Sequence, residues 1–176
     1  VNRCNDILKK LTLNPIIEDD FIDKDLSMSD YINEITKSFE EITKKKFILN
    51  FRQNLNSLKI TKSIEIVYGL RNFIGNANKF AKNKIFITVK SNSEFTEVTV
   101  EDDGNGYSKD ILNKIGDPYI KSLTKNENSK PGLGLGIFIG KTLLEKNYAK
   151  IICRNSQTRS GAEVIIRWKN KELINL

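Results

Sequence analysis

The chain has 176 residues, of which 39% are hydrophobic, and its 29 Lys and Arg exceed its 22 Asp and Glu, giving a formal charge of +7. This composition suits one domain with a buried core and excludes disordered and collagen-like classes. The chain has two cysteines and no histidine. These counts exclude Ser–His and Cys–His nucleophile pairs, a disulfide framework and the usual zinc sites, and they indicate a reducing compartment.

The positive charge is spread along the chain, and Lys44, Lys45 and Lys46 form its only run of three. No aromatic pattern of the RNA-binding kind accompanies it, so we expect a solvated lysine-rich surface and no nucleic-acid partner. No run of about 18 apolar residues occurs, and the chain begins with Val1 rather than Met. We therefore expect a cytoplasmic fragment of a longer protein.

The chain opens with two helical patterns. Apolar residues at spacings of three and four predict the end of a helix over residues 1–11, stopped by Asn14-Pro15. That stripe consists of Val1, Cys4, Leu8 and Leu11. After an acidic segment, Ser29 and Asp30 are candidate caps of the next helix. Its apolar positions are Ile32, Ile35, Phe39 and Ile42.

Strand and helix patterns alternate in the middle of the chain. Residues 47–53 alternate as a strand does, and a long helical pattern follows over residues 62–82. The apolar positions of this helix are Ile66, Leu70, Phe73, Ala77 and Phe80. Two more alternating segments, 85–90 and 97–102, predict strands joined by a polar turn.

The last third of the chain continues the mixed order. Ser108 is the candidate cap of a short helix ending at Ile115, and residues 116–131 have the composition of a loop. Apolar spacing predicts a helix over residues 135–147. Residues 149–154 and 162–168 then predict two closing strands. The order of elements predicts an α+β fold, a two-layer sandwich in which helices cover one face of a mixed sheet.

The segment RNFIGNANKF on the long helix is the first candidate site. Asn72 and Asn76 are four residues apart, so their side chains lie on one face of the helix. An amide oxygen can hold Mg²⁺ while water and phosphate oxygens fill its other positions. Lys79 lies near the same face, within reach of a phosphate. The alternative is a polar helix face in an asparagine-rich chain.

The segment EDDGNGY, residues 101–107, directly follows a predicted strand. Gly104 and Gly106 permit a tight turn, and the carboxylate of Asp102 can accept a hydrogen bond from an exocyclic amine such as that of adenine. An ordinary acidic turn has the same composition and is the alternative.

The segment PGLGLGIFIGKTLLE places Gly132, Gly134 and Gly136 before a predicted helix. Glycines there let the backbone approach a phosphate, whose charge is favoured by the free N–H groups of a helix N-terminus. The segment matches neither a Walker loop nor a Rossmann fingerprint. A flexible linker is the alternative, but Leu133 and Leu135 are poor linker residues.

With these motifs in this order, nearly the whole chain resembles the ATP-binding domain of sensor histidine kinases, a member of the Bergerat-fold group. RNFIGNANKF resembles the N box of that family, DDGNG its G1 box, residues 116–122 (GDPYIKS) its F box and GLGLG its G2 box, and RSGAEVIIRW is similar to its closing glycine and strand. The resemblance implies ATP and Mg²⁺ as cofactors. Asn76 would hold Mg²⁺, Asn72 and Lys79 would reach phosphates, and Asp102 would recognise adenine.

The resemblance also implies a set of nucleotide contacts and a catalytic group. The contacts would be Asn76, Lys79, Asp102, Gly104, Gly106, Tyr119, Gly132, Leu133, Gly134, Leu135 and Gly136. The catalytic residues would be Asn72, Asn76 and Lys79.

One position separates the chemistries within this group. Its hydrolytic members carry a glutamate one turn before the magnesium asparagine, where this chain has Asn72. An amide cannot take a proton from water near neutral pH, which favours phosphoryl transfer to a protein over hydrolysis. The alternatives are a nucleotide-binding module without transfer activity and an anti-sigma-type serine kinase.

The lead-in RCNDILKKL, with GDPYIKS and GLGIFIGKTLLE, resembles the redox-responsive histidine kinases of the RegB/PrrB/ActS type. The resemblance implies that residues 1–14 end a dimerisation and phosphoacceptor helix, that residues 15–176 form the catalytic domain, and that Cys4 is a redox candidate. A packing cysteine is the alternative for Cys4, and Cys153 is predicted to be buried. The phosphoacceptor histidine would lie upstream. The complete protein would be a homodimer in the bacterial inner membrane, with a response regulator as partner.

Overall fold

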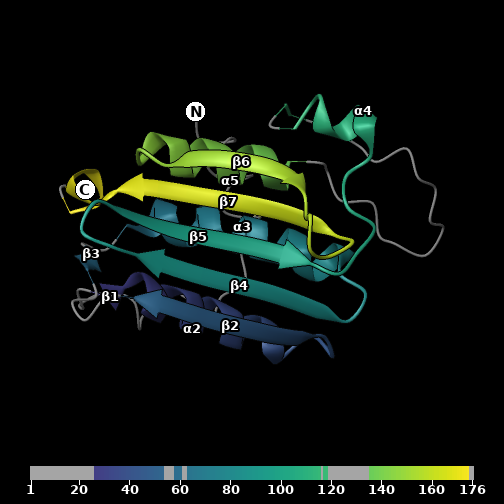
Figure 1. The fold of residues 1–176 in the computed structure, drawn as a ribbon, viewed down its shortest axis with the longest axis horizontal. Helices are drawn as coiled ribbons and strands as arrows, with labels where there is room; N and C mark the ends of the chain where they lie inside the picture. Colours follow the sequence, from purple (N-terminus) through teal and green to yellow (C-terminus); the bar gives the residue numbers. More distant parts are fainter. Residues whose placement is uncertain (1–25, 54–57, 61–62, 116, 119–134, 175–176) are drawn as a thin grey trace, which may run out of the picture.

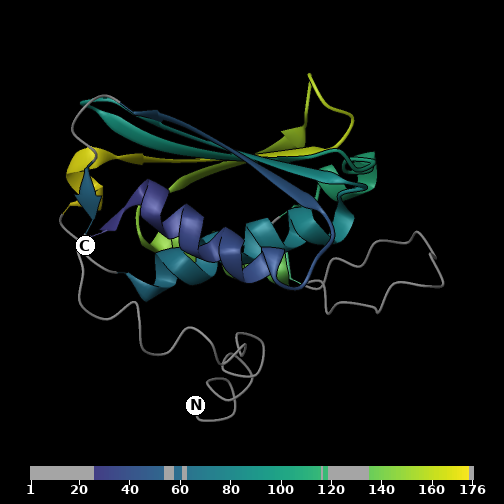
Figure 2. The same cartoon turned by 90° about the horizontal axis from the view of Figure 1, so that it is seen from below.

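The computed structural model describes residues 26–53, 58–60, 63–115, 117–118 and 135–174, which form two layers (Figure 1). One layer is a five-stranded sheet of order β2-β4-β5-β7-β6. Its strands are β2 (Lys46–Gln53), β4 (Lys84–Ser91), β5 (Phe95–Asp102), β6 (Lys150–Asn155) and β7 (Ala162–Lys169). Figure 2 shows the three long helices on one face of the sheet: α2 (Met28–Glu40), α3 (Ile64–Phe80) and α5 (Gly136–Lys146). The predicted α+β sandwich is confirmed.

The sheet is mixed because β2 runs parallel to β4, whereas the other neighbouring strands are antiparallel. The parallel pair is connected through α3, as parallel strands require a crossover. Successive side chains of a strand point to opposite faces. In β5 this alternation turns Val98, Val100 and Asp102 towards the helical layer, where all three are buried.

Helix α2 begins two to three residues earlier than its predicted caps suggest. Its N-cap is Ser27, whose hydroxyl accepts a hydrogen bond from the backbone N–H of Asp30, while the Asp30 carboxylate accepts one from the backbone N–H of Ser27 at 2.9 Å. The predicted cap Ser29 is therefore wrong, although Asp30 does take part in the cap. Ile42 lies beyond the helix and is 66% exposed, so it does not continue the buried stripe.

Helix α3 is shorter than predicted because Ser63 caps its start and the backbone turns away from helical geometry at Ala81. Its inner face packs closely on α5 through two glycines. A Cβ at Gly69 would lie 2.4 Å from Cγ of Leu144, and one at Gly140 would lie 3.1 Å from Cε2 of Phe73. Because a side chain at Gly69 or Gly140 would collide with the facing helix, these glycines let α3 and α5 lie in close contact. This contact brings the start of α5 onto the asparagine face of α3.

Four short elements complete the described structure. The two-residue strands β1 (Leu26–Ser27) and β3 (Lys59–Ile60) pair with each other, and a single turn of helix, α6 (Asn170–Leu173), follows β7. None of these three elements was predicted from the sequence. The predicted helix capped by Ser108 is α4 (Lys109–Leu112), shorter than expected. The predicted helix over residues 1–11 and most of the predicted loop over residues 116–131 lie outside the described residues.

Candidate functional site

The candidate site lies at one end of the sheet, where β5 ends and β7 begins (Figure 1). The turn after β5 lies beside the end of α3, since a Cβ at Gly104 would be only 2.4 Å from the backbone oxygen of Phe80. The same turn is bonded to the end of β6, because Asn155 hydrogen-bonds the backbone of Tyr107 in both directions. Residues distant in sequence therefore meet around one turn.

Asp102 is the buried acid of this site, with 3% of its surface exposed. Its Oδ1 accepts hydrogen bonds from the backbone N–H of Gly104 at 2.8 Å and of Ala162 at 3.3 Å. Burial raises the pKa of the Asp102 carboxyl, and these two hydrogen bonds partly offset the rise. Within the described residues nothing donates a hydrogen bond to Oδ2, so this oxygen can accept one from a ligand.

Asn72 and Asn76 face the first residue of α5. A Cβ at Gly136 would lie 3.4 Å from Nδ2 of Asn76 and 3.6 Å from Oδ1 of Asn72. The amide of Asn72 donates to the backbone oxygen of Tyr68 at 2.8 Å. By contrast, Nδ2 of Asn76 is buried and has no hydrogen-bond partner among the described residues. A buried amide without a partner is costly, so Asn76 is the member of the pair that a ligand would satisfy.

The backbone beside Asp102 is held by Asp103, a residue that the sequence analysis did not single out. Its carboxylate accepts hydrogen bonds from the backbone N–H groups of Lys82, Asn83 and Lys84 at 2.8 to 3.1 Å. Although desolvation acts in the opposite direction, these bonds lower the pKa of Asp103. Asp103 thus ties the turn after β5 to the segment between α3 and β4.

The far side of the turn is held by Asn155. Its Oδ1 accepts from the backbone N–H of Tyr107 at 2.6 Å, and its Nδ2 donates to the backbone oxygen of Tyr107 at 3.0 Å. Gly106 adopts a φ of 71°, which favours glycine.

Cys153, predicted to be buried, is half-buried against the core, and burial raises the pKa of its thiol to about 11. Burial also raises the pKa of the Tyr107 hydroxyl.

The remaining predicted site residues are placed less closely or not at all. Lys79 is exposed, and its ammonium lies 5.4 Å from the centre of the Phe80 ring. Leu135 is the N-cap residue of α5 and has no side-chain capping bond. The predicted residues that lie outside the described part of the chain are Cys4, Tyr119, Gly132, Leu133 and Gly134.

In the described ranges, no group of three or more Cys, Asp or Glu side chains is arranged to hold a metal ion. None of the described helices has the length and apolar character needed to cross a membrane.

A buried aspartate and a helix-borne asparagine thus lie at one end of a two-layer sandwich. The profile of one protein family, described as histidine kinase-, DNA gyrase B-, and HSP90-like ATPase, matches residues 61–172. The chain belongs to this family, and ATP is accordingly the nucleotide that its fold is built to bind.

The chain is also similar to individual sensor kinases. It is 32% identical over 130 residues to the sensor histidine kinase RegB of Cereibacter sphaeroides, a match covering 65% of this chain and 28% of RegB. It is 30% identical over 105 residues to the sensor protein SrrB of Staphylococcus aureus, covering 58% of this chain and 18% of SrrB. The chain thus spans less than a third of the length of these relatives.

Solved structures show the same fold. The mycobacterial sensor histidine kinase MprB matches with a TM-score of 0.68 at 15% identity, covering 82% of this chain and 96% of the solved one. The catalytic domain of the histidine kinase ThkA matches with a TM-score of 0.66 at 24% identity, covering 82% and 95%. At these identities the likeness shows the fold alone, which is that of histidine kinase catalytic domains.

Proposed function

We propose that this chain is the catalytic ATP-binding part of a two-component sensor histidine kinase. It transfers the γ-phosphoryl group of ATP to a histidine on a dimerisation helix, and an aspartate of a response regulator receives the group next. The similarity to RegB supports this proposal, and so does the family profile over residues 61–172, a range that contains RNFIGNANKF, DDGNG and GLGLG. One position on α3 bears on whether the domain transfers the γ-phosphoryl group to a protein or hydrolyses ATP.

The observation that carries the proposal is an amide where hydrolysis needs a carboxylate. Asn72 lies one turn before Asn76, with its Oδ1 towards Gly136 and its Nδ2 bonded to the backbone of Tyr68. An amide accepts no proton from water near neutral pH, so this position cannot serve as the general base of hydrolysis. Transfer to a protein depends chiefly on positioning and on charge stabilisation, and it tolerates the absence of such a base in this domain.

Within this proposal, Asp102 recognises the nucleotide base. Its Oδ1 is already occupied by Gly104 and Ala162, so Oδ2 is the oxygen that accepts a hydrogen bond from the amine of adenine. The backbone N–H bonds fix the carboxylate in one orientation before the base arrives. A fixed acceptor discriminates in favour of bases that carry an amine at the matching position.

Asn76 would hold Mg²⁺ through its amide oxygen. The buried atom without a partner is Nδ2, a donor, which a phosphate oxygen of the nucleotide would satisfy while the amide oxygen takes the cation. When bound, Mg²⁺ neutralises charge on the phosphate oxygens. Lys79, which is exposed at the end of α3, would reach the phosphates together with Asn72.

The proposal also assigns roles outside the described residues. Tyr119, Gly132, Leu133 and Gly134 would belong with Leu135 and Gly136 to the segment that contacts the nucleotide. Cys4 would be the redox-responsive thiol. In the complete protein, a dimerisation helix and an upstream membrane sensor would precede the catalytic domain.

The test replaces the amide by a carboxylate. Asn72→Glu should gain steady release of inorganic phosphate from ATP while still binding the nucleotide, whereas the wild-type chain should bind Mg·ATP and release little. Asn72→Gln is the matched control because it lengthens the side chain without adding a base. Rapid hydrolysis by the wild-type chain would contradict the proposal.

A second comparison separates the alternatives. Transfer to a supplied serine substrate, giving an acid-stable phosphoester, would favour the anti-sigma-type kinase. ATP binding without any transfer would favour a nucleotide-binding module.

A further inference from the structure

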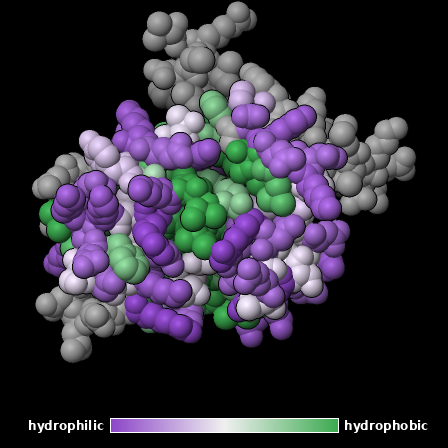
Figure 3. All heavy atoms as spheres, turned by 45° about the horizontal axis from the view of Figure 1, so that its top comes forward, coloured by the Kyte–Doolittle hydropathy of each residue, from purple (hydrophilic) through white to green (hydrophobic). Residues whose placement is uncertain are grey.

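The outer face of the sheet has no helical layer over it in the described part of the chain. Figure 2 shows the three long helices on the opposite face. Figure 3, in which the β6 side of the molecule comes forward, shows a central hydrophobic band between hydrophilic zones. One cross-strand row on the outer face is uncharged, and Ile165 and Ile152 are its two hydrophobic members. That row consists of Asn50, Thr88, Thr99, Ile165 and Ile152.

A charged row crosses all five strands beside this uncharged row. The register pairs these residues in sequence from β2 to β6, and we name the row the basic ladder: Arg52, Lys90, Glu97, Arg167 and Lys150. Its four cations are exposed, whereas Glu97 is 5% exposed. One carboxylate therefore stands among four cations.

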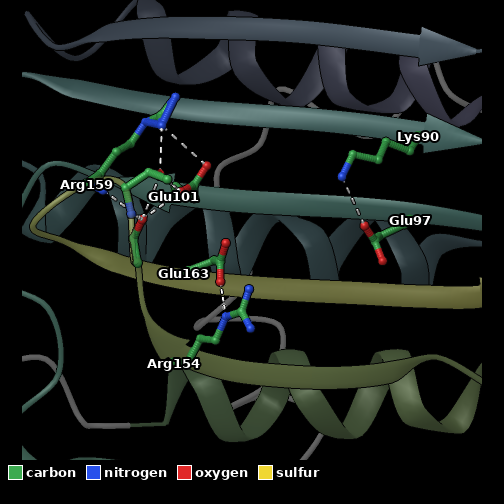
Figure 4. A network of polar contacts seen from close by, with 8 residues as sticks. Lys90, Glu97, Glu101, Arg154, Arg159 and Glu163 are labelled. Atoms are coloured by element: carbon green, nitrogen blue, oxygen red, sulfur yellow. Dashed lines mark hydrogen bonds and ion pairs between the residues drawn. The ribbon is translucent and has the colours of Figure 1, made fainter.

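The single acid of the ladder is already used. Glu97 accepts a hydrogen bond from Nε of Arg167 at 2.8 Å, and Nζ of Lys90 lies 3.8 Å from its other oxygen (Figure 4). The guanidinium of Arg167 is also held over the ring of Phe95, 4.8 Å from its centre. Arg167 is thus fixed in place with one face of its guanidinium group on the protein and further N–H groups free to donate.

The ends of the ladder place like charges opposite each other. Arg52 is the register partner of Lys90, and Arg167 is the partner of Lys150. Directly opposed like charges destabilise a sheet, so these two pairs, unlike the contacts of Glu97, do not stabilise the fold. An anionic partner laid along it would relieve the repulsion.

The charged row nearest to the end of β7 that follows Gly161 is balanced. Glu101 lies 3.8 Å from the guanidinium of Arg159, and Glu163 is paired with Arg154 (Figure 4). The ladder carries its excess of positive charge at the end of β5 away from Asp102, whereas the opposed pair Lys46 and Lys84 lies at the other end of this face.

We propose that the basic ladder binds an acidic α-helix of a partner protein. Neighbouring strands are about 4.8 Å apart, so the ladder repeats its positions at that interval over about 19 Å. Acidic residues three or four apart along one face of a helix repeat at about 5.4 Å, which matches this interval closely. The ladder sets four exposed cations in one line across the sheet, which suits a narrow anionic element better than the broad surface of a membrane. Binding there leaves the nucleotide site open.

The test uses a synthetic helical peptide with glutamates every three or four residues along one face, and a second peptide of the same composition with the glutamates scattered around the helix. The ladder variant is Lys90→Glu with Lys150→Glu, and the control variant is Lys37→Glu with Lys44→Glu. The control makes the same change in charge at exposed positions of the helical layer and the loop after α2. Lys90→Gln with Lys150→Gln serves if the reversed variant does not fold, and ATP binding reports the fold of every variant.

The wild-type chain should bind the one-faced peptide about 10-fold more tightly than the scattered one, and added salt should weaken the binding. The ladder variant should lose this preference while the control variant keeps it. Equal losses in both variants, or equal affinity for both peptides, would reduce the interaction to net charge and overturn the proposal. Stronger, ladder-dependent binding to vesicles containing phosphatidylglycerol, or to duplex DNA, would overturn it in favour of that partner.

Discussion

Gly161 is the glycine whose replacement bears most directly on the candidate site. A Cβ there would lie 2.0 Å from the backbone oxygen of Asp102 and 2.3 Å from its Oδ1. Both distances are far below the 3.0 Å that real Cβ atoms keep, and the backbone oxygen cannot rotate aside as a flexible side chain does. Gly161→Ala must therefore displace Asp102 or the turn that precedes β7.

The displacement needed is about 1 Å, and overpacking of this kind costs about 1–3 kcal/mol of unfolding free energy. For a chain of this size, each kcal/mol lowers Tm by about 2–4 °C, so a fall of about 2–12 °C is expected. Moving Oδ1 also weakens its hydrogen bonds to Gly104 and Ala162, which orient the carboxylate. A loss of about 10-fold or more in ATP affinity should accompany the fall in Tm, equivalent to about 1.4 kcal/mol.

Thermal unfolding and calorimetric titration with ATP measure both effects. Gly75→Ala is the matched control, because its Cβ would lie 3.4 Å from Cζ of Phe39, an ordinary contact, and Ala is favoured over Gly inside a helix by about 0.5–1 kcal/mol. The control should therefore keep its ATP affinity and hold or raise its Tm. An unchanged Tm and ATP affinity in Gly161→Ala would refute the account of how Asp102 is held.

Three further predictions concern the ionisable groups Asp102, Asp103 and Cys153. Asp102→Asn should weaken ATP binding yet raise Tm at neutral pH, because burial raises the pKa of the carboxyl and so disfavours its charged form. The gain in Tm should vanish below pH 3.8, the usual pKa of the group, because the wild-type carboxyl is then neutral in both the folded and the unfolded state. Asp103→Ala should lower the free energy of unfolding by about 1–2 kcal/mol near neutral pH, because the backbone hydrogen bonds to the carboxylate are lost. Since the pKa of Asp103 is lowered in the folded state, the difference in unfolding free energy between variant and wild type should persist above pH 3.8 and disappear as the pH falls through the lowered pKa. Urea titrations at several pH values measure it. In Cys4→Ser, the remaining Cys153 should react with iodoacetamide at a rate that keeps rising towards pH 11; a plateau near pH 9 would show a thiol less buried than the structure places it.

The sequence predicted the long elements because their apolar residues repeat at regular spacings. Helix α3 follows from the stripe through Ile66, Leu70 and Phe73, all of them buried. The ends of elements were harder to predict because two serines near the start of α2 are equally suited as caps. The structure uses Ser27 as the N-cap, and Ser27 also pairs with Lys59 in the small sheet. This contact between distant segments leaves no local signal in the sequence.

In the candidate site, too, local spacing was predictable and contacts between distant segments were not. The spacing of Asn72 and Asn76 predicted a shared helix face, and the structure places both against Gly136. Asp103 was missed because it and Asp102 both have the composition of an acidic turn. Their different roles depend on the pleat, which turns Asp102 inward, and on the nearness of residues 82–84, which are distant in sequence.

The central claim is that this chain passes phosphate to a histidine rather than to water. The direct measurement supplies the histidine-bearing dimerisation segment of the same protein in trans, adds Mg²⁺ and γ-labelled ATP, and follows how the label divides between protein and free phosphate. The account predicts label on the segment in an acid-labile, base-stable form that is lost in Asp102→Asn. Label found only as free phosphate, with the nucleotide bound and consumed, would contradict it.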